Sequence, residues 1–287
     1  MSAKVAFLGL GVMGFPMAGH LKAKGYDVTV YNRSAEKAKA WVEKHGGKSA
    51  PTPAEAVKDC DFVMMCVGND KDLLEVALGA QGALAGMKKG AVLVDHTTAS
   101  ADAARKIYAE AKAKGVPFID GPVSGGQAGA ENGKLTVMCG GDKEPFERAK
   151  PVMDSYGKAV TLMGESGAGQ LTKMVNQICI AGLLQGLSEG IAFAEKAKLD
   201  VPLVLDVISK GAAQSWQMEN RGKTMHARKF DFGFAVDWMR KDLGICLEEA
   251  KRNGAKLPVT EVVDQFYADV QKAGGNRFDT SSLITRL

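Results

Sequence analysis

A glycine-rich segment near the N-terminus constrains the fold of this chain more than any other feature. The apolar run Val5–Leu8 precedes the spacing G-x-G-x-x-G at Gly9, Gly11 and Gly14, and residues 13–24 have a helical pattern. A strand, a glycine turn and a helix in this order bind a dinucleotide pyrophosphate, because the turn allows close approach and the helix N-terminus attracts anions. A purely structural turn is the alternative. The expected cofactor-binding residues are Gly9, Leu10, Gly11, Val12, Met13 and Gly14.

The residues after the second predicted strand, 27–31, indicate which dinucleotide binds. An acidic side chain there would accept a hydrogen bond from the ribose 2′-hydroxyl of NAD. This chain instead has Asn32, Arg33 and Ser34. A guanidinium is a planar, bidentate donor that suits a 2′-phosphate. We therefore expect NADP(H) to be preferred, with NAD(H) possible; a solvated arginine at a helix start is the alternative.

Apolar strands alternate with helices up to about residue 120, which is typical of a doubly wound, mostly parallel sheet. Further strands are predicted at 61–67, 91–95, 117–120, 135–139 and 159–162. Helices are predicted at 36–44, 70–78, 101–114 and 144–153, with Ser100 as an N-cap. Residues 121–126 are too glycine-rich to begin a helix, so we expect a loop whose backbone N–H groups bind an anion.

Ligands of such sheets bind at the carboxyl ends of the strands. Cys66 and Val67 end one predicted strand and are candidate cofactor contacts, or else only core and loop residues. His96 ends the next strand and is a candidate base, although the sequence indicates no acidic partner for its ring.

The second half of the chain is predicted to be helical. Apolar residues recur at helical spacing over one long segment, about 169–197. Further helices are predicted at 201–210, 235–252 and 259–273, and the last dozen residues look loosely ordered. The expected fold is therefore an α/β, Rossmann-type sheet domain, residues 1–164, followed by an all-α domain, residues 165–287, with the long helix joining them.

Composition argues against several classes of protein. The 287 residues are 46% hydrophobic and 24% charged, and the net charge of +4 comes from mixed signs, so nucleic acid is not an expected partner. No apolar run approaches the roughly 18 residues of a membrane span, and the N-terminus has no signal-peptide pattern, which predicts a cytoplasmic protein without a membrane partner. Five scattered cysteines indicate reduced thiols, and four histidines without ligand spacing predict no metal site.

Lys173 lies on the long predicted helix, one turn before Asn176 and Gln177, so the three side chains can share a face. A lysine among apolar neighbours at a domain junction can have a perturbed pKa and perform acid–base chemistry. The alternative is a lysine whose stem covers apolar surface while its ammonium stays in water. Lys241 and Asp242, on a later helix, are by themselves typical of a solvated ion pair.

Four motifs occur in order along the chain: GLGVMGFPMA at 9–18, DGPVSGG at 120–126, GQLTKMVN at 169–176 and KDL at 241–243. With them the chain resembles the β-hydroxyacid dehydrogenase family, which includes 3-hydroxyisobutyrate dehydrogenase, tartronate semialdehyde reductase and glyoxylate/succinic semialdehyde reductases. The resemblance covers essentially the whole length.

The resemblance implies roles for the matching residues. Lys173 would be the catalytic lysine, and Ser124, Gly125 and Gly126 would bind the carboxylate and carbonyl of the substrate. Many members have asparagine four residues after the lysine, where this chain has Gln177 with Asn176 one residue earlier. Either amide would then orient the substrate. The implied cofactor contacts are Cys66, Val67, Thr98 and Lys241.

The residues and the resemblance together predict an NADPH-preferring oxidoreductase. It would transfer hydride between the nicotinamide and a short, carboxylate-bearing hydroxyacid or semialdehyde, with Lys173 as general acid and base. An imine reductase shares the architecture but usually lacks the lysine, and a catalytically silent NADP-binding interaction module is a further alternative. The long apolar helix predicts a homodimer or homotetramer, because such a helix needs more cover than one small domain gives.

Overall fold

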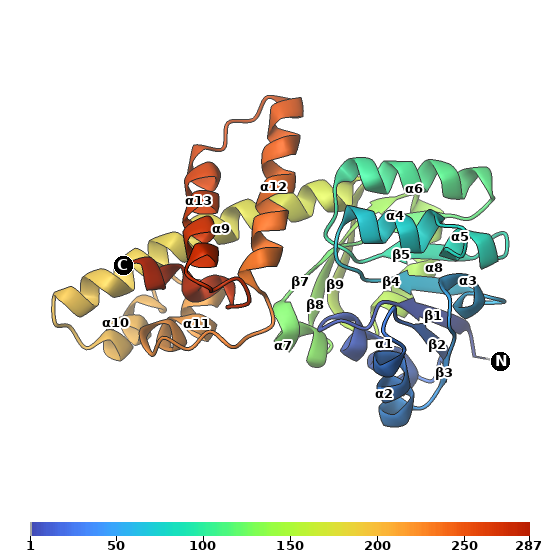
Figure 1. Cartoon of the computed structure of the whole chain (residues 1–287), viewed down its shortest axis with the longest axis horizontal. Helices are drawn as coiled ribbons and strands as arrows, with labels where there is room; N and C mark the ends of the chain where they lie inside the picture. Colours follow the sequence, from blue (N-terminus) through green and yellow to red (C-terminus); the bar gives the residue numbers. More distant parts are fainter. Residues whose placement is uncertain (1) are drawn as a thin grey trace. The chain divides into compact units, whose positions relative to one another are not determined.

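The computed structural model describes residues 2–287, and the chain divides into two compact units. The first unit ends at Lys173 and the second begins at Met174, so the division falls inside one long helix (Figure 1). The expected domain bounds, 1–164 and 165–287, stay a prediction. Each unit is described by itself below.

The first unit is built on a nine-stranded sheet in the order β3-β2-β1-β4-β5-β6-β8-β7, with β9 paired to β8. The pairs from β3 to β6 are parallel, β8 is antiparallel to β6 and β7, and β9 is parallel to β8. The predicted doubly wound, mostly parallel sheet is thereby confirmed. The strands are β1 (Lys4–Leu8), β2 (Asp27–Tyr31), β3 (Lys48–Ser49), β4 (Phe62–Met65), β5 (Val92–Asp95), β6 (Phe118–Asp120), β7 (Val123–Ser124), β8 (Leu135–Gly141) and β9 (Gly157–Gly164).

Helices cover both faces of this sheet (Figure 1). Side chains alternate along a strand, so Val5 and Phe7 pack in one core cluster while Ala6 and Leu8 pack in the other. Both faces are buried, which explains why the strands are continuous apolar runs. One face carries α1 (Gly14–Ala23), α2 (Ala35–His45), α7 (Gly126–Glu131) and α8 (Lys143–Met153), and the other carries α3 (Pro53–Ala56), α4 (Asp70–Leu78), α5 (Ala83–Gly86) and α6 (Ala101–Ala113).

The segment at 121–126 differs from its prediction. It was expected to be too glycine-rich to begin a helix, but Ser124 ends β7 and α7 begins at Gly126. Gly125 has φ of +131°, a backbone conformation that turns the chain from the strand into the helix and that a side chain would strain. The expectation was wrong because glycine serves here as the hinge before the helix.

The second unit is all helical, as predicted. Its helices pack around one core cluster that contains Leu184, Leu243 and Tyr267. The helix α11 was not predicted, because its apolar residues are few. The elements are α9 (Ala168–Lys196), which begins in the first unit, then α10 (Val201–Ile208), α11 (Trp216–His226), α12 (Val236–Asn253), α13 (Pro258–Lys272) and the 3-10 helix η1 (Thr280–Arg286).

The C-terminal residues are ordered by burial and not loose. Leu283 and Ile284 lie in the core of the helical unit, and the Tyr267 hydroxyl donates to the carbonyl oxygen of Thr280. The Asp279 carboxylate accepts the backbone N–H of Ser281 at the start of η1. The prediction of a loose tail was wrong because a stretch this short contains too few apolar residues to show a period.

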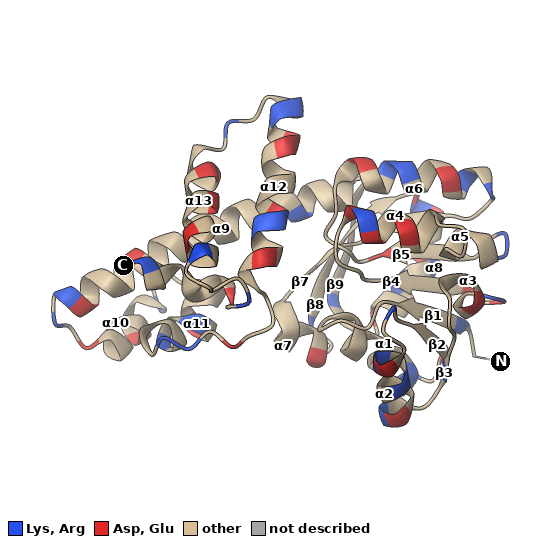
Figure 2. Cartoon of the chain, viewed as in Figure 1, with Lys and Arg blue, Asp and Glu red and all other residues tan. Residues whose placement is uncertain are grey.

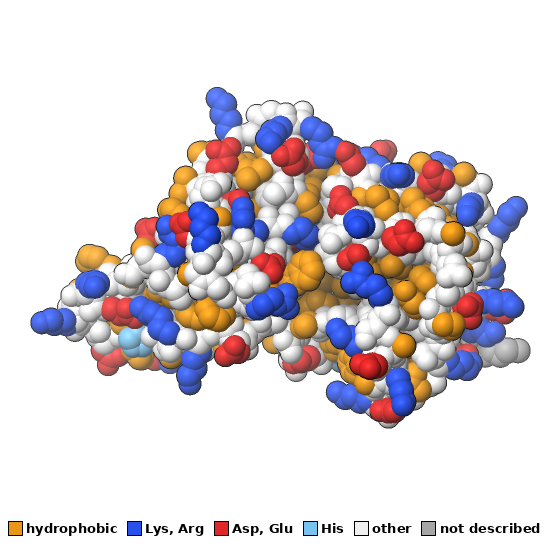
Figure 3. Space-filling view, in the orientation of Figure 1, with side chains coloured by type: hydrophobic (Ala, Val, Ile, Leu, Met, Phe, Trp, Pro, Cys, Tyr) orange, Lys and Arg blue, Asp and Glu red, His pale blue; other side chains and the backbone are white. Residues whose placement is uncertain are grey.

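The prediction that no apolar run approaches the length of a membrane span is unchanged, because polar residues interrupt α9. By length and average composition this helix could nevertheless cross a membrane, although one such helix is weak grounds for a span. Ala181, Leu184, Leu187 and Ile191 of this helix lie in the core of the helical unit, which accounts for its composition. Charges of both signs are mixed over both units (Figures 2 and 3).

We expect Leu283→Ala to destabilise the helical unit, because Leu283 is fully buried in its core. Truncating a buried leucine costs about 2–5 kcal/mol. Leu287→Ala is the matched control, since that side chain is 50% exposed and surface substitutions cost less than about 0.5 kcal/mol. Urea unfolding of both variants measures the difference. Equal, small effects would mean that the tail is loosely ordered after all.

Candidate active site

The glycine turn after β1 has the geometry that a dinucleotide requires. Gly9 has φ of +98°, and a Cβ there would overlap the carbonyl oxygen of Cys66. A Cβ at Gly14 would overlap the carbonyl oxygen of Gly9, so this glycine lets α1 pack close to the turn. At Gly11, by contrast, a Cβ would meet no atom within 4 Å. That open space beside exposed backbone fits the approach of a pyrophosphate.

Asn32 connects this turn to the end of β2 through two hydrogen bonds of its side chain. Its Oδ1 accepts the backbone N–H of Leu10 at 2.9 Å, and its Nδ2 donates to the carbonyl oxygen of Ser34 at 3.0 Å. Both ends of the amide are therefore used within the protein. Sequence reasoning placed Asn32 among the cofactor contacts and missed this positioning role, because the partner Leu10 lies 22 residues away.

Arg33 and Ser34 lie at the surface after β2. Arg33 Nη1 is 3.2 Å from Asp72 Oδ1, and the arginine side chain is 86% exposed. Ser34 occupies the N-cap position of α2 without a side-chain capping bond. The predicted cation is thus at the expected strand end, and it is paired there with a carboxylate that the sequence had not indicated.

The ends of β4 and β5 are joined by hydrogen bonds. The backbone N–H of Val67 donates to Thr97 Oγ1 at 3.0 Å, and the N–H of Thr97 donates to Asp95 Oδ1 at 3.0 Å. Cys66, Val67 and Thr98 are half-buried at these two ends, beside the glycine turn that Cys66 contacts. The three predicted contacts therefore lie together at the carboxyl ends of two neighbouring strands, β4 and β5.

His96 is a structural histidine. It is 1% exposed, with Nδ1 2.6 Å from the carbonyl oxygen of Gly121 and Nε2 2.7 Å from the Tyr156 hydroxyl. A carbonyl oxygen can only accept, so Nδ1 donates to it and Nε2 accepts from the hydroxyl. Burial lowers the pKa of His96 to about 4. The neutral ring, bonded at both nitrogens, does not support the candidate role of base; it joins the ends of β5 and β6.

The first turn of α9 is fixed on the same strand ends by four buried hydrogen bonds. Asp120, the last residue of β6, accepts the backbone N–H groups of Gly167 at 2.7 Å and Gln170 at 3.0 Å. The Gln170 side chain accepts from the N–H of Ala99 at 3.0 Å and donates to the carbonyl oxygen of Thr97 at 2.7 Å. Burial raises the pKa of Asp120 to about 6, and the two N–H bonds oppose that rise.

Lys173 follows Gln170 by three residues, so the two side chains leave α9 on the same side. Gln170 uses that side to reach Thr97, at the end of β5. Lys173 is 6% exposed. The lysine is therefore buried one turn beyond the residues that the four hydrogen bonds hold at the carboxyl ends of β5 and β6.

The segment that leads to Ser124 is held by two backbone hydrogen bonds. The N–H of Gly121 donates to the carbonyl oxygen of Asp95 at 2.6 Å, and Pro122 accepts from the N–H of Met138 at 3.1 Å. Ser124 then pairs with Thr136 of β8 and is half-buried. Gly125, which precedes α7, and Gly126, which begins it, are also half-buried.

The helical unit contains the remaining predicted residues. Gln177 Nε2 donates to Asp242 Oδ2 at 2.6 Å, and Gln177 Oε1 accepts from Asn176 Nδ2 at 2.7 Å. Lys241 Nζ is 2.9 Å from Asp242 Oδ1. Asp242 is 3% exposed, so the interpretation of Lys241 and Asp242 as a solvated pair was wrong. Gln177 is 1% exposed with both ends of its amide bonded, whereas Asn176 is half-buried.

Two family models together match nearly the whole chain. Residues 4–164 match the NAD binding domain of 6-phosphogluconate dehydrogenase, and residues 167–287 match the NAD-binding region of NADP-dependent 3-hydroxyisobutyrate dehydrogenase. The chain belongs to the β-hydroxyacid dehydrogenase family. Members of this family catalyse NAD(P)-dependent oxidoreduction of β-hydroxyacids, and the chain accordingly uses NAD(P)(H).

Relatives in this family match over the full length of the chain. Identity is 64% over 285 residues with an uncharacterized oxidoreductase of Shewanella frigidimarina, covering 99% of this chain and 98% of that one. It is 42% over 287 residues with the probable 3-hydroxyisobutyrate dehydrogenase-like 1, mitochondrial, of Arabidopsis thaliana, covering 100% and 85%. It is 33% over 286 residues with 2-hydroxy-3-oxopropionate reductase of Escherichia coli, covering 99% and 97%.

Two solved structures have the same fold as this chain. The 3-hydroxyisobutyrate dehydrogenase of Mycobacterium tuberculosis with L-serine has a TM-score of 0.88 and 29% identity, covering 100% of this chain and 99% of that one. Psf3 in complex with NADP+ and 2-OPP has a TM-score of 0.90 and 25% identity, covering 98% and 99%.

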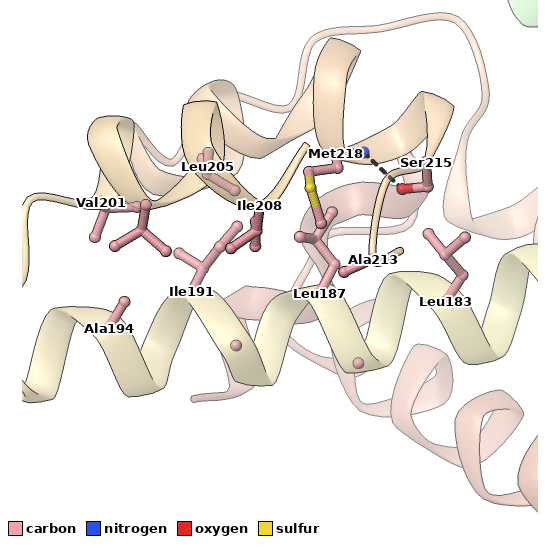
Figure 4. Close-up of a pocket in the computed structure, with 13 residues that line it drawn as sticks. Leu183, Leu187, Ile191, Ala194, Val201, Leu205, Ile208, Ala213, Ser215 and Met218 are labelled. Atoms are coloured by element: carbon pink, nitrogen blue, oxygen red, sulfur yellow. Dashed lines mark hydrogen bonds between the residues drawn. The ribbon is translucent and has the colours of Figure 1, made fainter. Parts of the chain in front are cut away.

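A cavity of about 280 Å³ in the helical unit does not contain the family's reacting groups. It lies between the second half of α9 and the helices α10 and α11, and Leu187, Ile191 and Leu205 point into it (Figure 4). Ser215 is the polar residue of its lining, and its hydroxyl accepts the N–H of Met218 as the cap of α11. Over residues 2–287, no group of three or more His, Cys, Asp or Glu side chains could hold a metal ion.

The buried, neutral His96 makes stability depend on pH. Its folded pKa of about 4 lies below the ordinary value of about 6.5, so between these values the unfolded chain binds the extra proton and stability falls as pH falls. We expect the stability of the wild type relative to His96→Gln to drop by about 2 kcal/mol from pH 7 to pH 5. Denaturant unfolding of both proteins at the two pH values measures this, and a pH-independent difference would contradict it.

Proposed function

We propose that this protein is an NADPH-preferring oxidoreductase that transfers hydride between the nicotinamide and a short, carboxylate-bearing β-hydroxyacid or semialdehyde. Lys173 acts as general acid and base. The observation that carries the proposal is a buried lysine one turn beyond four hydrogen bonds that hold α9 at the carboxyl ends of β5 and β6. Ligands of open α/β sheets bind at those ends.

The proposed cofactor site lies at the carboxyl ends of the neighbouring strands β2, β1, β4 and β5. The glycine turn would hold the pyrophosphate, and the Arg33 guanidinium would bind the 2′-phosphate of NADP(H). Binding of NAD(H) stays possible, because the turn does not depend on that phosphate. When bound, the nicotinamide supplies the hydride chemistry. The further contacts that we propose are Cys66, Val67, Thr98 and, from the family resemblance, Lys241.

The residues of the chain would supply position and charge. Negative charge grows on the carbonyl oxygen of the aldehyde during reduction, and the Lys173 ammonium would stabilise it and donate the proton. In the oxidative direction the neutral amine would accept that proton. The Ser124 hydroxyl and the backbone of Gly125 and Gly126 would hold the substrate carboxylate.

The amide that orients the substrate is, in this proposal, Asn176. Many family members have asparagine at the position of Gln177. Here both ends of the Gln177 amide are bonded, to Asn176 and to buried Asp242. Using Gln177 for substrate would leave that carboxylate short of a donor, which costs about 1–3 kcal/mol. Asn176 is half-buried and donates to the neutral Gln177 amide, so giving up this bond for substrate would leave the donor of Asp242 in place.

Lys173→Ala is the direct test of the mechanism. Loss of the proton donor should lower turnover by about 10²- to 10⁴-fold, while NADPH binding measured by fluorescence titration is retained. Lys196→Ala removes an exposed lysine from the far end of the same helix and should leave turnover unchanged. Near-normal turnover in Lys173→Ala would remove the lysine from the mechanism.

The substrate for this assay comes from a panel run with NADPH and NADH side by side. It contains glyoxylate, succinic semialdehyde, 2-hydroxy-3-oxopropionate, a neutral aldehyde and a cyclic imine, with 3-hydroxyisobutyrate and serine in the oxidative direction. We expect the neutral aldehyde to react poorly, because it cannot use the Ser124 segment. Turnover of cyclic imines alone would support an imine reductase. Binding of NADPH without any turnover would support an interaction module.

We also propose that the enzyme is a cytoplasmic homodimer or homotetramer. No disulfide joins the five cysteines, all of which lie within residues 2–287, and this fits a reducing compartment. Hydrophobic side chains reach the surface of the helical unit in several places (Figure 3). Phe193, Leu203 and Val207 are 73%, 59% and 60% exposed. Leu203 and Val207 are one turn apart on α10 and so share a face, which a partner subunit would cover.

Leu203→Asp tests the assembly. A charge in an apolar interface should shift the protein toward monomer by at least about tenfold in dissociation constant. Sedimentation velocity across a concentration series measures the shift. Lys210→Glu changes charge just beyond the end of α10 and serves as the control. A wild type that sediments as a monomer at all concentrations would refute the proposal.

A further inference from the structure

Arg33, the proposed 2′-phosphate ligand, is already paired with a carboxylate. Its Nη1 donates a hydrogen bond to Asp72 Oδ1 at 3.2 Å. The two partners differ in freedom, because the arginine side chain is 86% exposed and the aspartate side chain only 29%. The carboxylate is the fixed member of the pair, and the guanidinium is the member that can move.

Asp72 is held in place by the first turn of α4. Its backbone N–H donates to the Asn69 side chain at 2.9 Å, which caps the helix. The neighbouring Asp70 carboxylate accepts the N–H of Ser100 at 2.9 Å, and this bond ties the same turn to the start of α6. A carboxylate in the first turn is also stabilised by the helix dipole. Asp72 therefore presents a fixed negative charge to the end of β2.

No other group in the segments 32–34 and 69–72 offers Arg33 the same interaction. Asn32 is neutral and bonded at both ends of its amide, and Asp70 is engaged with Ser100. Lys71 is exposed and carries the same sign of charge as Arg33. Of the two cations and two carboxylates in these segments, Arg33 and Asp72 are therefore the pair in contact.

We propose that Asp72 is a cofactor-specificity residue that limits the preference for NADPH over NADH. The inference rests on the proposed function, in which Arg33 binds the 2′-phosphate. A phosphate of about two negative charges must take the guanidinium from Asp72 and then remain beside that carboxylate. NADH has a neutral hydroxyl at this position, so the pair of Arg33 and Asp72 can persist. Asp72 thus weakens NADPH binding and hardly affects NADH binding.

Asp72→Asn should therefore tighten NADPH binding. We expect its dissociation constant to fall by about threefold to tenfold at low salt, the effect of removing one charge near the surface. The dissociation constant of NADH should change by less than about twofold. Fluorescence titration with each cofactor measures both values without any substrate. The gain should shrink at about 1 M salt, where the Debye length is only about 3 Å.

Three further variants isolate the cause of the change. Asp72→Glu keeps the charge and should retain the wild-type ratio of the two dissociation constants. Glu75→Gln removes an exposed carboxylate one turn further along α4, away from Arg33, and should also leave the ratio unchanged. In an Arg33→Ala background the gain from Asp72→Asn should be smaller, because only direct repulsion of the phosphate remains. Thermal unfolding without cofactor establishes that each variant is folded.

The outcomes separate this inference from the proposed function. If Arg33→Ala leaves NADPH binding unchanged, the proposed preference for NADPH is overturned. If Arg33→Ala weakens NADPH binding while Asp72→Asn does not strengthen it, the role of Asp72 is overturned and the preference stands. Tightening of both cofactors by the same factor would also count against Asp72 as a specificity residue.

Discussion

The buried carboxylate of Asp120 is the interaction on which the candidate active site depends. It accepts the N–H groups of Gly167 and Gln170, which lie at the start of α9 and have no partner within the helix. The Gln170 side chain adds two bonds to the loop after β5. Shifting the lysine-bearing turn would leave these buried groups unpaired, at about 1–3 kcal/mol each. The position of Lys173 is therefore set by buried hydrogen bonds at the start of α9.

This arrangement needs the helix to lie very close to the sheet, and glycines provide the room. A Cβ at Gly169 would lie 2.7 Å from the carbonyl oxygen of Asp120, and one at Gly140 would lie 2.7 Å from its carboxylate. Either substitution would push the helix away and break the bonds to Asp120. The residues ahead of Lys173 thus serve two purposes. Gly169 gives room for close packing on the sheet, and Gly167 and Gln170 donate the hydrogen bonds to Asp120.

The sequence predicts the parts of this protein that depend on local patterns. The strand at 27–31 and the cap at Ser100 are confirmed, because apolar runs and capping residues act over a few positions. The bonds that build the site leave no such pattern: Asp120 lies 47 residues before Gly167, and Thr97 lies 73 before Gln170. Lys173 was ambiguous from its neighbours alone, and only the order of four motifs gave it a predicted role.

Two groups at the strand ends respond to acid in opposite directions. Between about pH 4 and pH 6 the folded chain binds the extra proton at Asp120, whose pKa is raised to about 6, so this group makes stability decline as pH rises. The pKa of His96 is lowered to about 4, so over the same interval it makes stability increase with pH. The two slopes oppose each other. A flat stability profile in weak acid is therefore compatible with two strongly perturbed groups, which only single substitutions can separate.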